Sequence, residues 1–305
     1  MHAALLHLDN ALLRQSRLRH AICAGSGRIL NYRDLGPALR LWSRPGPLRR
    51  LGRRLACALP ATLGPTIVFS GSGDFHHVSV LLISRALDVA SGTPVTVVHF
   101  DNHPDWVKFG PGAHCGSWVG QVARLPGVAR LLTVGVCSDD IDRPASTGAD
   151  LQIVRNGKVE LYAYTSGSAD GALTVAGRRW PTIEALGEAA FAAHLVGRIT
   201  TEAIYITIDK DVLHPDDAGT NWDQGRTRLA YLSDLIAAVT KGRRLVGADV
   251  VGDWSKPAYG NGPLHALLKR GEAMLDQPRS EPSREMQHRN EAVNLALLDQ
   301  LRSAA

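Results

Sequence analysis

Two short acidic runs, each directly after a β-branched apolar stretch, constrain the fold of this chain more than any other feature. Asp101-Asn102-His103-Pro104-Asp105 follows Val95–Phe100, and Asp209-Lys210-Asp211 follows Ile204–Ile208. Apolar runs of this length and composition predict buried strands. In an extended chain, residues i and i+2 point to the same side. The sequence therefore predicts that the carboxylates and the imidazole of each run share one side at the end of a strand.

A third segment adds an imidazole to these acids. Gly71–His77 follows the apolar run Thr66–Ser70 and leads into a helical pattern over Val78–Leu87. Four carboxylates and two histidines exceed the three protein ligands of a catalytic zinc, so we expect two divalent ions. Carboxylate oxygen with some imidazole suits manganese, or another borderline divalent metal, better than it suits a soft metal.

Charge counting supports a site of this kind. Four aspartates and two divalent ions nearly cancel, and a hydroxide bridging the ions would leave about one negative charge. Such a site favours a cationic or polarised neutral substrate. The alternative interpretation, solvated acidic loops, fits a single Asp-x-Asp better than three segments with matching strand-to-loop placement.

The three motifs together resemble those of the arginase, agmatinase and formiminoglutamase family of ureohydrolases, over about residues 65–300. The family's Gly-Gly-Asp-His element is matched by Ser72–His76, its Asp-Ala-His-x-Asp by Asp101–Asp105, and its Ser-Phe-Asp-x-Asp by Thr207–Asp211. The resemblance implies a three-layer α/β/α arginase-like fold with a mostly parallel central sheet. It also implies a hydrolase of linear amidine or guanidine C–N bonds.

Carried over to this sequence, the resemblance implies a binuclear centre. His76 and Asp105 would hold one manganese, His103 and Asp211 the other, and Asp101 and Asp209 would bridge both. One extra residue after Asp74 leaves both His76 and His77 open as the first imidazole ligand, and we favour His76. The implied nucleophile is a hydroxide bridging the metals, with Asp105 passing a proton to the leaving amine.

Further residues are predicted to handle substrate. His114 loosely matches a family histidine that is thought to relay protons or bind substrate. Family members that cleave guanidines carry a glutamate where this chain has Gly252, and we expect Asp253, one step on, to hold a substrate cation through paired hydrogen bonds. Trp222 is predicted to line the pocket while Asn221 or Gln224 binds the substrate tail, the alternative being a packed loop anchored by Trp222.

The predicted site is compatible with three functions. The first is a ureohydrolase acting on a small guanidino compound. The second is a metal-dependent deacylase or amidohydrolase of the histone-deacetylase-like type, which would use one zinc held by two aspartates and one histidine. The third is a non-catalytic, metal-stabilised binding protein, suggested by the missing glutamate at Gly252.

Charge is distributed unevenly along the chain. Residues 1–60 contain eleven Arg and, as acids, only Asp9 and Asp34, whereas the whole chain is +5, so residues 61–305 are mildly acidic. We therefore expect an Arg-rich N-terminal extension over 1–60, a catalytic domain over 61–305, and no nucleic-acid partner. The basic run Arg40–Arg54 could bind phosphate or an acidic partner, or form a solvated face or a subunit contact.

The remaining features predict a cytoplasmic protein. The early run Ala3–Leu8 is broken by Asp9 and lacks a basic leader, and no stretch reaches the roughly 18 apolar residues of a membrane span. Four widely spaced cysteines predict reduced thiols. The family resemblance suggests a homo-oligomer, with the number of subunits left open.

Strand-like runs alternate with helical patterns, which predicts a parallel sheet covered on both faces. Strands are expected at Thr66–Ser70, Val95–Phe100, Leu131–Val136, Ile204–Ile208 and Leu245–Val250, with shorter ones at Leu151–Val154 and Val159–Thr165. Helices are expected at Val78–Leu87, Trp118–Arg124, Ile183–Val196, Leu229–Val239 and Glu285–Leu301, with a loop over Gln277–Pro282.

Overall fold

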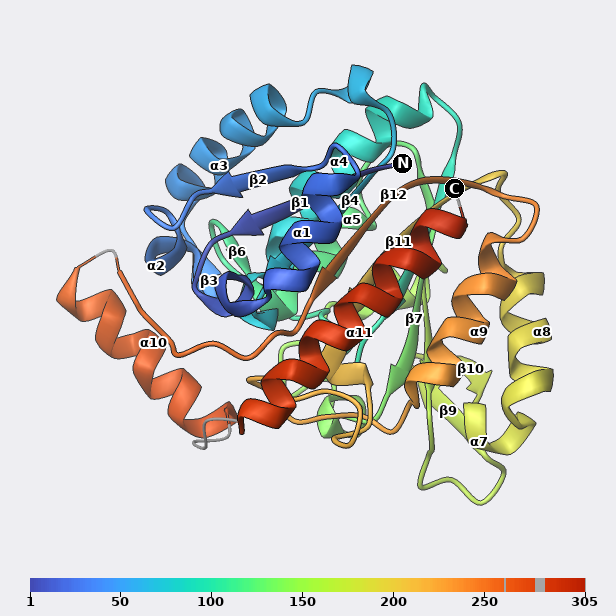
Figure 1. Ribbon diagram of the computed structural model, residues 1–305. Helices are drawn as coiled ribbons and strands as arrows, with labels where there is room; N and C mark the ends of the chain where they lie inside the picture. Colours follow the sequence, from blue (N-terminus) through green and yellow to red (C-terminus); the bar gives the residue numbers. More distant parts are fainter. Residues whose placement is uncertain (261, 278–282, 305) are drawn as a thin grey trace.

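A single parallel sheet lies between two layers of helices in the computed structural model, which describes residues 1–260, 262–277 and 283–304 (Figure 1). The sheet has eight strands in the order β2-β1-β4-β12-β11-β5-β7-β8, and each neighbouring pair is parallel. The strands are β1 (His2–His7), β2 (Arg28–Asn31), β4 (Thr66–Gly71), β5 (Val95–Phe100), β7 (Val128–Val136), β8 (Val159–Ala163), β11 (Ala203–Asp209) and β12 (Arg244–Val251). The predicted three-layer α/β/α arrangement is confirmed.

Helices cover both faces of this sheet. On one face α1, α11, α9 and α8 form a row in which each helix contacts the next, and the other face carries α4 with α5 beside it. The longer helices are α1 (Ser16–Ala24), α3 (Pro45–Ala58), α4 (Ser79–Ala90), α8 (Glu188–Arg198), α9 (Leu229–Thr240), α10 (Pro263–Asp276) and α11 (Arg284–Ser303). The short ones are α2 (Gly36–Leu39), α5 (Trp118–Val122), α6 (Leu151–Arg155) and α7 (Ile183–Leu186).

Two small antiparallel pairs sit outside the main sheet. One is β9 (Ala172–Val175) with β10 (Arg178–Pro181), and the other is β3 (Trp42–Ser43) with β6 (Ala113–His114). In the second pair Trp42 lies opposite His114. The pair therefore joins the N-terminal region to the segment that carries a predicted site residue.

The central strands are buried because they are apolar on both faces. All residues of β4, β5 and β11 are buried. β11 pairs with β5 on one side and with β12 on the other, so Thr207 lies beside both His99 and Asp249. This register brings polar side chains of three strands together just below the ends where the acidic runs begin.

Most predicted elements are confirmed, and one is wrong. The five main strands and the helices α4, α5, α9 and α11 match their predicted ranges to within a few residues. Leu151–Val154, predicted as a strand, is part of α6. The predicted helix Ile183–Val196 is broken into α7 and α8 at Gly187, whose φ is 76°. Residues 278–282 of the predicted loop lie outside the described residues.

The first 60 residues are part of the sheet. β1 pairs with β4 on one side and with β2 on the other. α3, which holds much of the basic run, buries Leu51 and Leu55 in the core. The boundary expected at residue 60 therefore does not separate two structural units.

All four cysteines are free thiols. Among the helices of the described ranges, none has both the length and the apolar character needed to cross a bilayer.

Candidate metal centre

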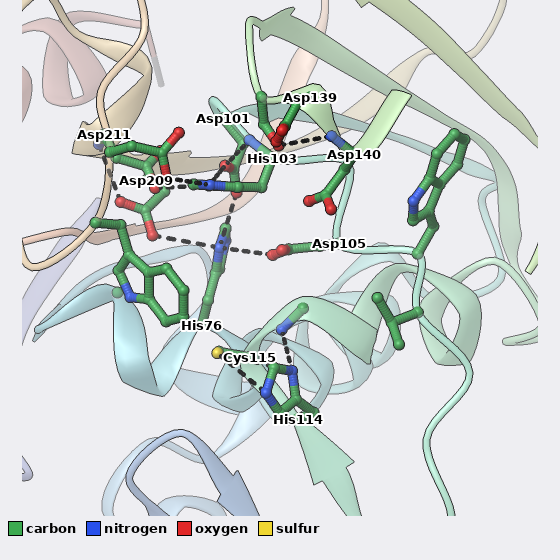
Figure 2. Close-up of a pocket in the computed structure, with 17 residues that line it drawn as sticks. His76, Asp101, His103, Asp105, His114, Cys115, Asp139, Asp140, Asp209 and Asp211 are labelled. Carbon is green, nitrogen blue, oxygen red and sulfur yellow. Dashed lines mark hydrogen bonds and ion pairs between the residues drawn. The ribbon is translucent and has the colours of Figure 1, made fainter. Parts of the chain in front are cut away.

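A pocket of about 270 Å³ opens where the carboxyl ends of β4, β5 and β11 meet the loops that follow them. All six side chains predicted as metal ligands line this pocket: His76, Asp101, His103, Asp105, Asp209 and Asp211. Figure 2 shows them turned toward one another from separate segments of the chain. Substrates of open α/β sheets also bind at this end of the strands.

Turns, rather than strand alternation, bring the ligands together. His76 lies in the 3-10 turn η3 (Gly73–Val78) that follows β4. β5 ends at Phe100, so the run from Asp101 to Asp105 is a loop. Asp105 has a φ of 47°, in the left-handed region that Asp tolerates better than most residues. This backbone conformation lets Asp105 line the same pocket as Asp101.

Five of the six side chains fall into two groups that share Asp101, and Asp209 lies near the first group through His76. Nδ1 of His76 lies 3.1 Å from Oδ2 of both Asp101 and Asp105, and 3.6 Å from Oδ2 of Asp209. Nδ1 of His103 lies 3.0 Å from Oδ2 of Asp211 and 3.6 Å from Oδ1 of Asp101. Within the described residues, His76, His99, Asp101 and Asp105 form one set that could hold a metal, and Asp101, His103 and Asp211 form another.

The tautomer of His76 follows from its second hydrogen bond. Nε2 of His76 lies 3.0 Å from the hydroxyl of Thr207, which donates its single proton to Asp249 at 2.7 Å. Thr207 must therefore accept from Nε2–H of His76. In the neutral ring this leaves Nδ1 unprotonated, with its lone pair directed at the carboxylates, as a metal ligand requires.

The adjacent His77 is in a different position. It is buried and does not line the pocket, and neither of its ring nitrogens has a hydrogen-bond partner in the described part of the chain. Burial lowers its pKa to about 3, so the ring stays neutral. These contacts favour His76 over His77 as the ligand.

Three residues that were not predicted for the site, His99, Asp223 and Trp118, contact the candidate ligand side chains from the side away from the cluster. Nε2 of His99 lies 2.7 Å from Oδ2 of Asp101, and Nε2 of His103 lies 2.9 Å from Oδ1 of Asp223. The indole of Trp118 donates to Asp105. Such contacts fix the orientation of metal ligands and tune their affinity. His99 could have been found, because it lies on β5 two residues before Asp101.

The cluster is crowded with negative charge. Burial, and then the neighbouring Asp101, raise the pKa of Asp209 to about 7, and burial with Asp209 raises the pKa of Asp211. Burial alone would lower the pKa of His76, but its contacts with Asp101 and Asp105 raise it. Among the described residues that line the pocket there is no Lys or Arg. These oxygen and imidazole donors fit hard or borderline divalent cations.

Two glycines make room for Asp209. A Cβ on Gly73 would come within 2.5 Å of Oδ2 of Asp209. A Cβ on Gly252 would overlap Oδ1 of Asp209 and the backbone nitrogen of Lys210, and the φ of Gly252 is 94°. The position where the family carries a glutamate therefore takes no side chain while Asp209 and its turn are placed as they are here.

The pocket is also lined by His114, Cys115 and Trp222. Nδ1 of His114 accepts from the backbone of Gly116 at 2.9 Å, so the neutral ring carries its proton on Nε2, which lies 2.5 Å from Oε1 of Glu272. Burial raises the pKa of Cys115 well above its usual range, so this residue stays a thiol. Trp222 donates to Asp74 at 3.0 Å.

Two predicted substrate residues do not reach the pocket. Asn221 is buried, bonded to Ser72 and to the backbone of Ser255. The carboxylate of Asp253 is also buried and accepts from Lys210 at 2.6 Å, from Gln15 at 2.8 Å and from Asn294 at 2.9 Å. With its oxygens already paired outside the pocket, Asp253 does not fit the predicted role of holding a substrate cation.

No family model and no curated protein sequence matches this chain. Solved structures match it over nearly its whole length. An arginase from Bacillus caldovelox has a TM-score of 0.60 and 13% identity and covers 98% of this chain and 97% of its own. An Entamoeba histolytica arginase in complex with L-ornithine has a TM-score of 0.61 and 12% identity, and the match covers 98% of this chain and 97% of the arginase. A hypothetical agmatinase from Burkholderia thailandensis has a TM-score of 0.56 and 17% identity, and the match covers 99% of this chain and 86% of the agmatinase. The predicted arginase-like fold is thereby confirmed.

Proposed function

We propose that this protein is a binuclear metal-dependent hydrolase that cleaves a guanidino- or amidino-type C–N bond. The observation that carries the proposal is that Asp101 belongs to both sets of potential ligands. A carboxylate shared in this way can bridge two ions that lie side by side. The arginase-like fold supports the same assignment.

The donor set fits two divalent ions. His76 and Asp105 would hold one ion, His103 and Asp211 the other, and Asp101 and Asp209 would contact both. Carboxylate-rich sites with some imidazole suit Mn²⁺, which is therefore our proposed metal. When bound, the two ions would supply Lewis acidity and a nucleophilic water near neutral pH.

The chain's own residues would then position the substrate and move protons. Oδ2 of Asp105 is fixed by His76 and Trp118, and Asp105 lines the pocket, so we assign it the transfer of a proton to the leaving amine. His114 also lines the pocket, with its Nε2 held by Glu272. We assign His114 to substrate positioning or to proton exchange through that pair.

The charge of the pocket favours a cationic substrate. Beyond the proposed ligands it is lined by Asp139, Asp140 and Asp223, and no described Lys or Arg lines it to offset them. A substrate carboxylate would find no cationic partner there, whereas an amine or a guanidinium would. We therefore propose a small guanidine that carries an amine tail.

The deacylase-type alternative keeps one supporting observation. Gly252 occupies the position where guanidine-cleaving family members have a glutamate, and the carboxylate of Asp253 accepts a hydrogen bond from Lys210. A site without that carboxylate could accept a neutral amide. That alternative uses a single metal, so the number of bound ions separates the two functions.

The test combines metal content with turnover. Protein reconstituted with Mn²⁺ would be assayed by elemental analysis and, in the same sample, screened for urea release from guanidines with and without an α-carboxylate, such as arginine and agmatine. We expect two ions per chain and faster turnover of the compound without the carboxylate. One ion with amide hydrolysis would favour the deacylase, and two ions without turnover of any guanidine or amide would contradict the proposed enzyme.

A further inference from the structure

Helix α10 lies apart from the two helical layers, at the edge of the molecule beside α2 and β3 (Figure 1). It carries four of the large apolar side chains that are exposed in the described residues. Leu264, Leu267, Leu268 and Met274 are 65%, 67%, 55% and 62% exposed. At 100° per residue, these four and Gly271 fall on one stripe about 120° wide.

Three polar side chains of α10, those of His265, Lys269 and Glu272, contact the rest of the protein, whereas Arg270 is exposed. Lys269 is fully buried, with its Nζ 4.6 Å from the centre of the Trp42 ring and donating to the backbone of Ala38 at 3.2 Å. Glu272 accepts from the Trp42 indole at 3.1 Å and from His114. A surface helix of a monomer ordinarily buries its apolar side and exposes its charges. α10 instead exposes four large apolar side chains while it buries Lys269.

A glycine lies at the middle of the exposed stripe. A Cβ on Gly271 would meet no atom within 4 Å, and Gly271 does not have the positive φ that selects for glycine. A glycine inside a helix is less stable than an alanine there, and no contact with the described residues accounts for Gly271. A residue without a side chain lets a second helix approach closely at that point.

We propose that α10 is a self-association surface, on which two copies of this chain pair their α10 helices across a two-fold axis near Gly271. The stripe is apolar, so its partner must be apolar as well. Among the described residues the other exposed large apolar side chains are Ile29, Phe109 and Leu186, which belong to other segments. The face that best matches α10 is therefore α10 of a second copy, as an isologous dimer requires.

The size of the surface sets the strength of the dimer. Four side chains that are about 60% exposed offer roughly 400–500 Å² per partner, about half of a standard stable interface. Pairing through α10 alone should thus be reversible and depend on concentration. Because Glu272 and Lys269 rest against Trp42 and His114, pairing also holds one wall of the pocket in place.

Analytical ultracentrifugation of the metal-loaded full chain, from about 1 to about 100 µM, would test the proposal. We expect a monomer–dimer equilibrium whose dissociation constant rises at least about 100-fold in Leu267→Glu and in Leu268→Glu. Leu186→Glu, at an exposed leucine of α7, is the matched control and should leave the equilibrium unchanged. Circular dichroism and metal content confirm that each variant is folded.

A cysteine at the proposed axis gives a second, independent measurement. In a background with Cys23→Ser and Cys57→Ser, Gly271→Cys should form a disulfide-linked dimer on mild oxidation. Gly197→Cys, on the exposed side of α8 where a Cβ also meets nothing, should not. Self-association does not depend on turnover. The dimer can therefore be absent from an active hydrolase, and it can be present in a protein without hydrolase activity.

Three outcomes would overturn the proposal. One is a monomer at every concentration, and another is a dimer that Leu267→Glu and Leu268→Glu leave intact. The third is binding of α10 to vesicles containing anionic lipid without self-association, which would assign the stripe to a membrane surface instead.

Discussion

The candidate metal centre and helix α10 differ in how their polar side chains are supported. In the metal centre, buried carboxylates and imidazoles contact one another and are held from behind by His99, Asp223 and Trp118. In α10, a buried lysine and a half-buried glutamate attach a helix whose apolar side faces out. The first region is fixed by many mutual contacts, whereas the second depends on few. Substitutions should therefore act strongly and locally in the centre, and weakly but with an effect on assembly in α10.

The strongest test of this contrast removes the shared ligand. Asp101→Asn keeps the shape of the side chain but removes the charge that both metal groups use. We expect both ions to be lost together and turnover to fall at least about 1000-fold, equal to about 4 kcal/mol of transition-state stabilisation. Elemental analysis and rates of urea release measure the two effects.

The matched control is Asp253→Asn, a buried aspartate outside the pocket. Its loss leaves Lys210 without its charge partner, so we expect it to lower the free energy of unfolding by about 3 kcal/mol while two ions stay bound. If Asp101→Asn retains one ion, the carboxylate is not shared between two sites.

The two adjacent histidines should differ in effect. His76→Ala removes a ring whose Nδ1 faces three carboxylates, so we expect about one ion per chain to remain and turnover to fall roughly 100-fold. His77→Leu replaces a ring that has no hydrogen bond in the described residues, and metal content should not change. Metal titration followed by calorimetry would measure the number of ions bound by each variant. The opposite result would assign the ligand to His77.

A smaller effect is expected at the second contact of His103. Asp223→Asn leaves every proposed ligand in place but weakens the acceptor that orients the ring of His103. We expect Mn²⁺ affinity to fall about 10–100-fold, or roughly 1.4–2.7 kcal/mol. Competition with a metal-binding dye gives the affinity. An unchanged affinity would mean that Asp223, which is mostly exposed, does not support the ligand.

The smallest effect should come from the α10 side. Glu272→Gln retains an oxygen that can accept from His114 but loses the charge beside Lys269. We expect turnover to fall less than about tenfold, no change in metal content, and faster hydrogen exchange over Pro263–Asp276. A loss of bound metal in this variant would mean that α10 and the metal centre are not separate in the way described above.

The sequence predicted the central strands and the six side chains of the cluster because both carry local signals. Runs such as Val95–Phe100 are apolar and β-branched throughout, and each acidic run follows such a strand directly. The short strands β1 and β2 lack such runs, so the basic composition around them suggested an extension. Leu151–Val154 is too short for periodicity to separate helix from strand.

The supporting residues depended on strand pairing, which a single sequence does not give. Asp249 holds Thr207, and through it His76, only because β12 pairs with β11 in this register. Asp253 was expected in the pocket because it follows a strand whose end faces the metals. The carboxylate of Asp253 instead accepts from the buried amine of Lys210, outside the pocket. These two residues lie 43 positions apart in the sequence.

The strand order also determines when the candidate cluster can form during synthesis of the chain. β12, the last strand of the sheet to leave the ribosome, belongs between β4 and β11. Until residues 203–251 have been made, the pieces β2-β1-β4 and β5-β7-β8 each keep an unpaired edge, and long-range parallel pairing of this kind is slow. His76 and Asp101 belong to opposite pieces. The nascent chain therefore cannot bring the side chains of the candidate cluster together early, and a prematurely terminated product would expose unpaired sheet edges that favour aggregation.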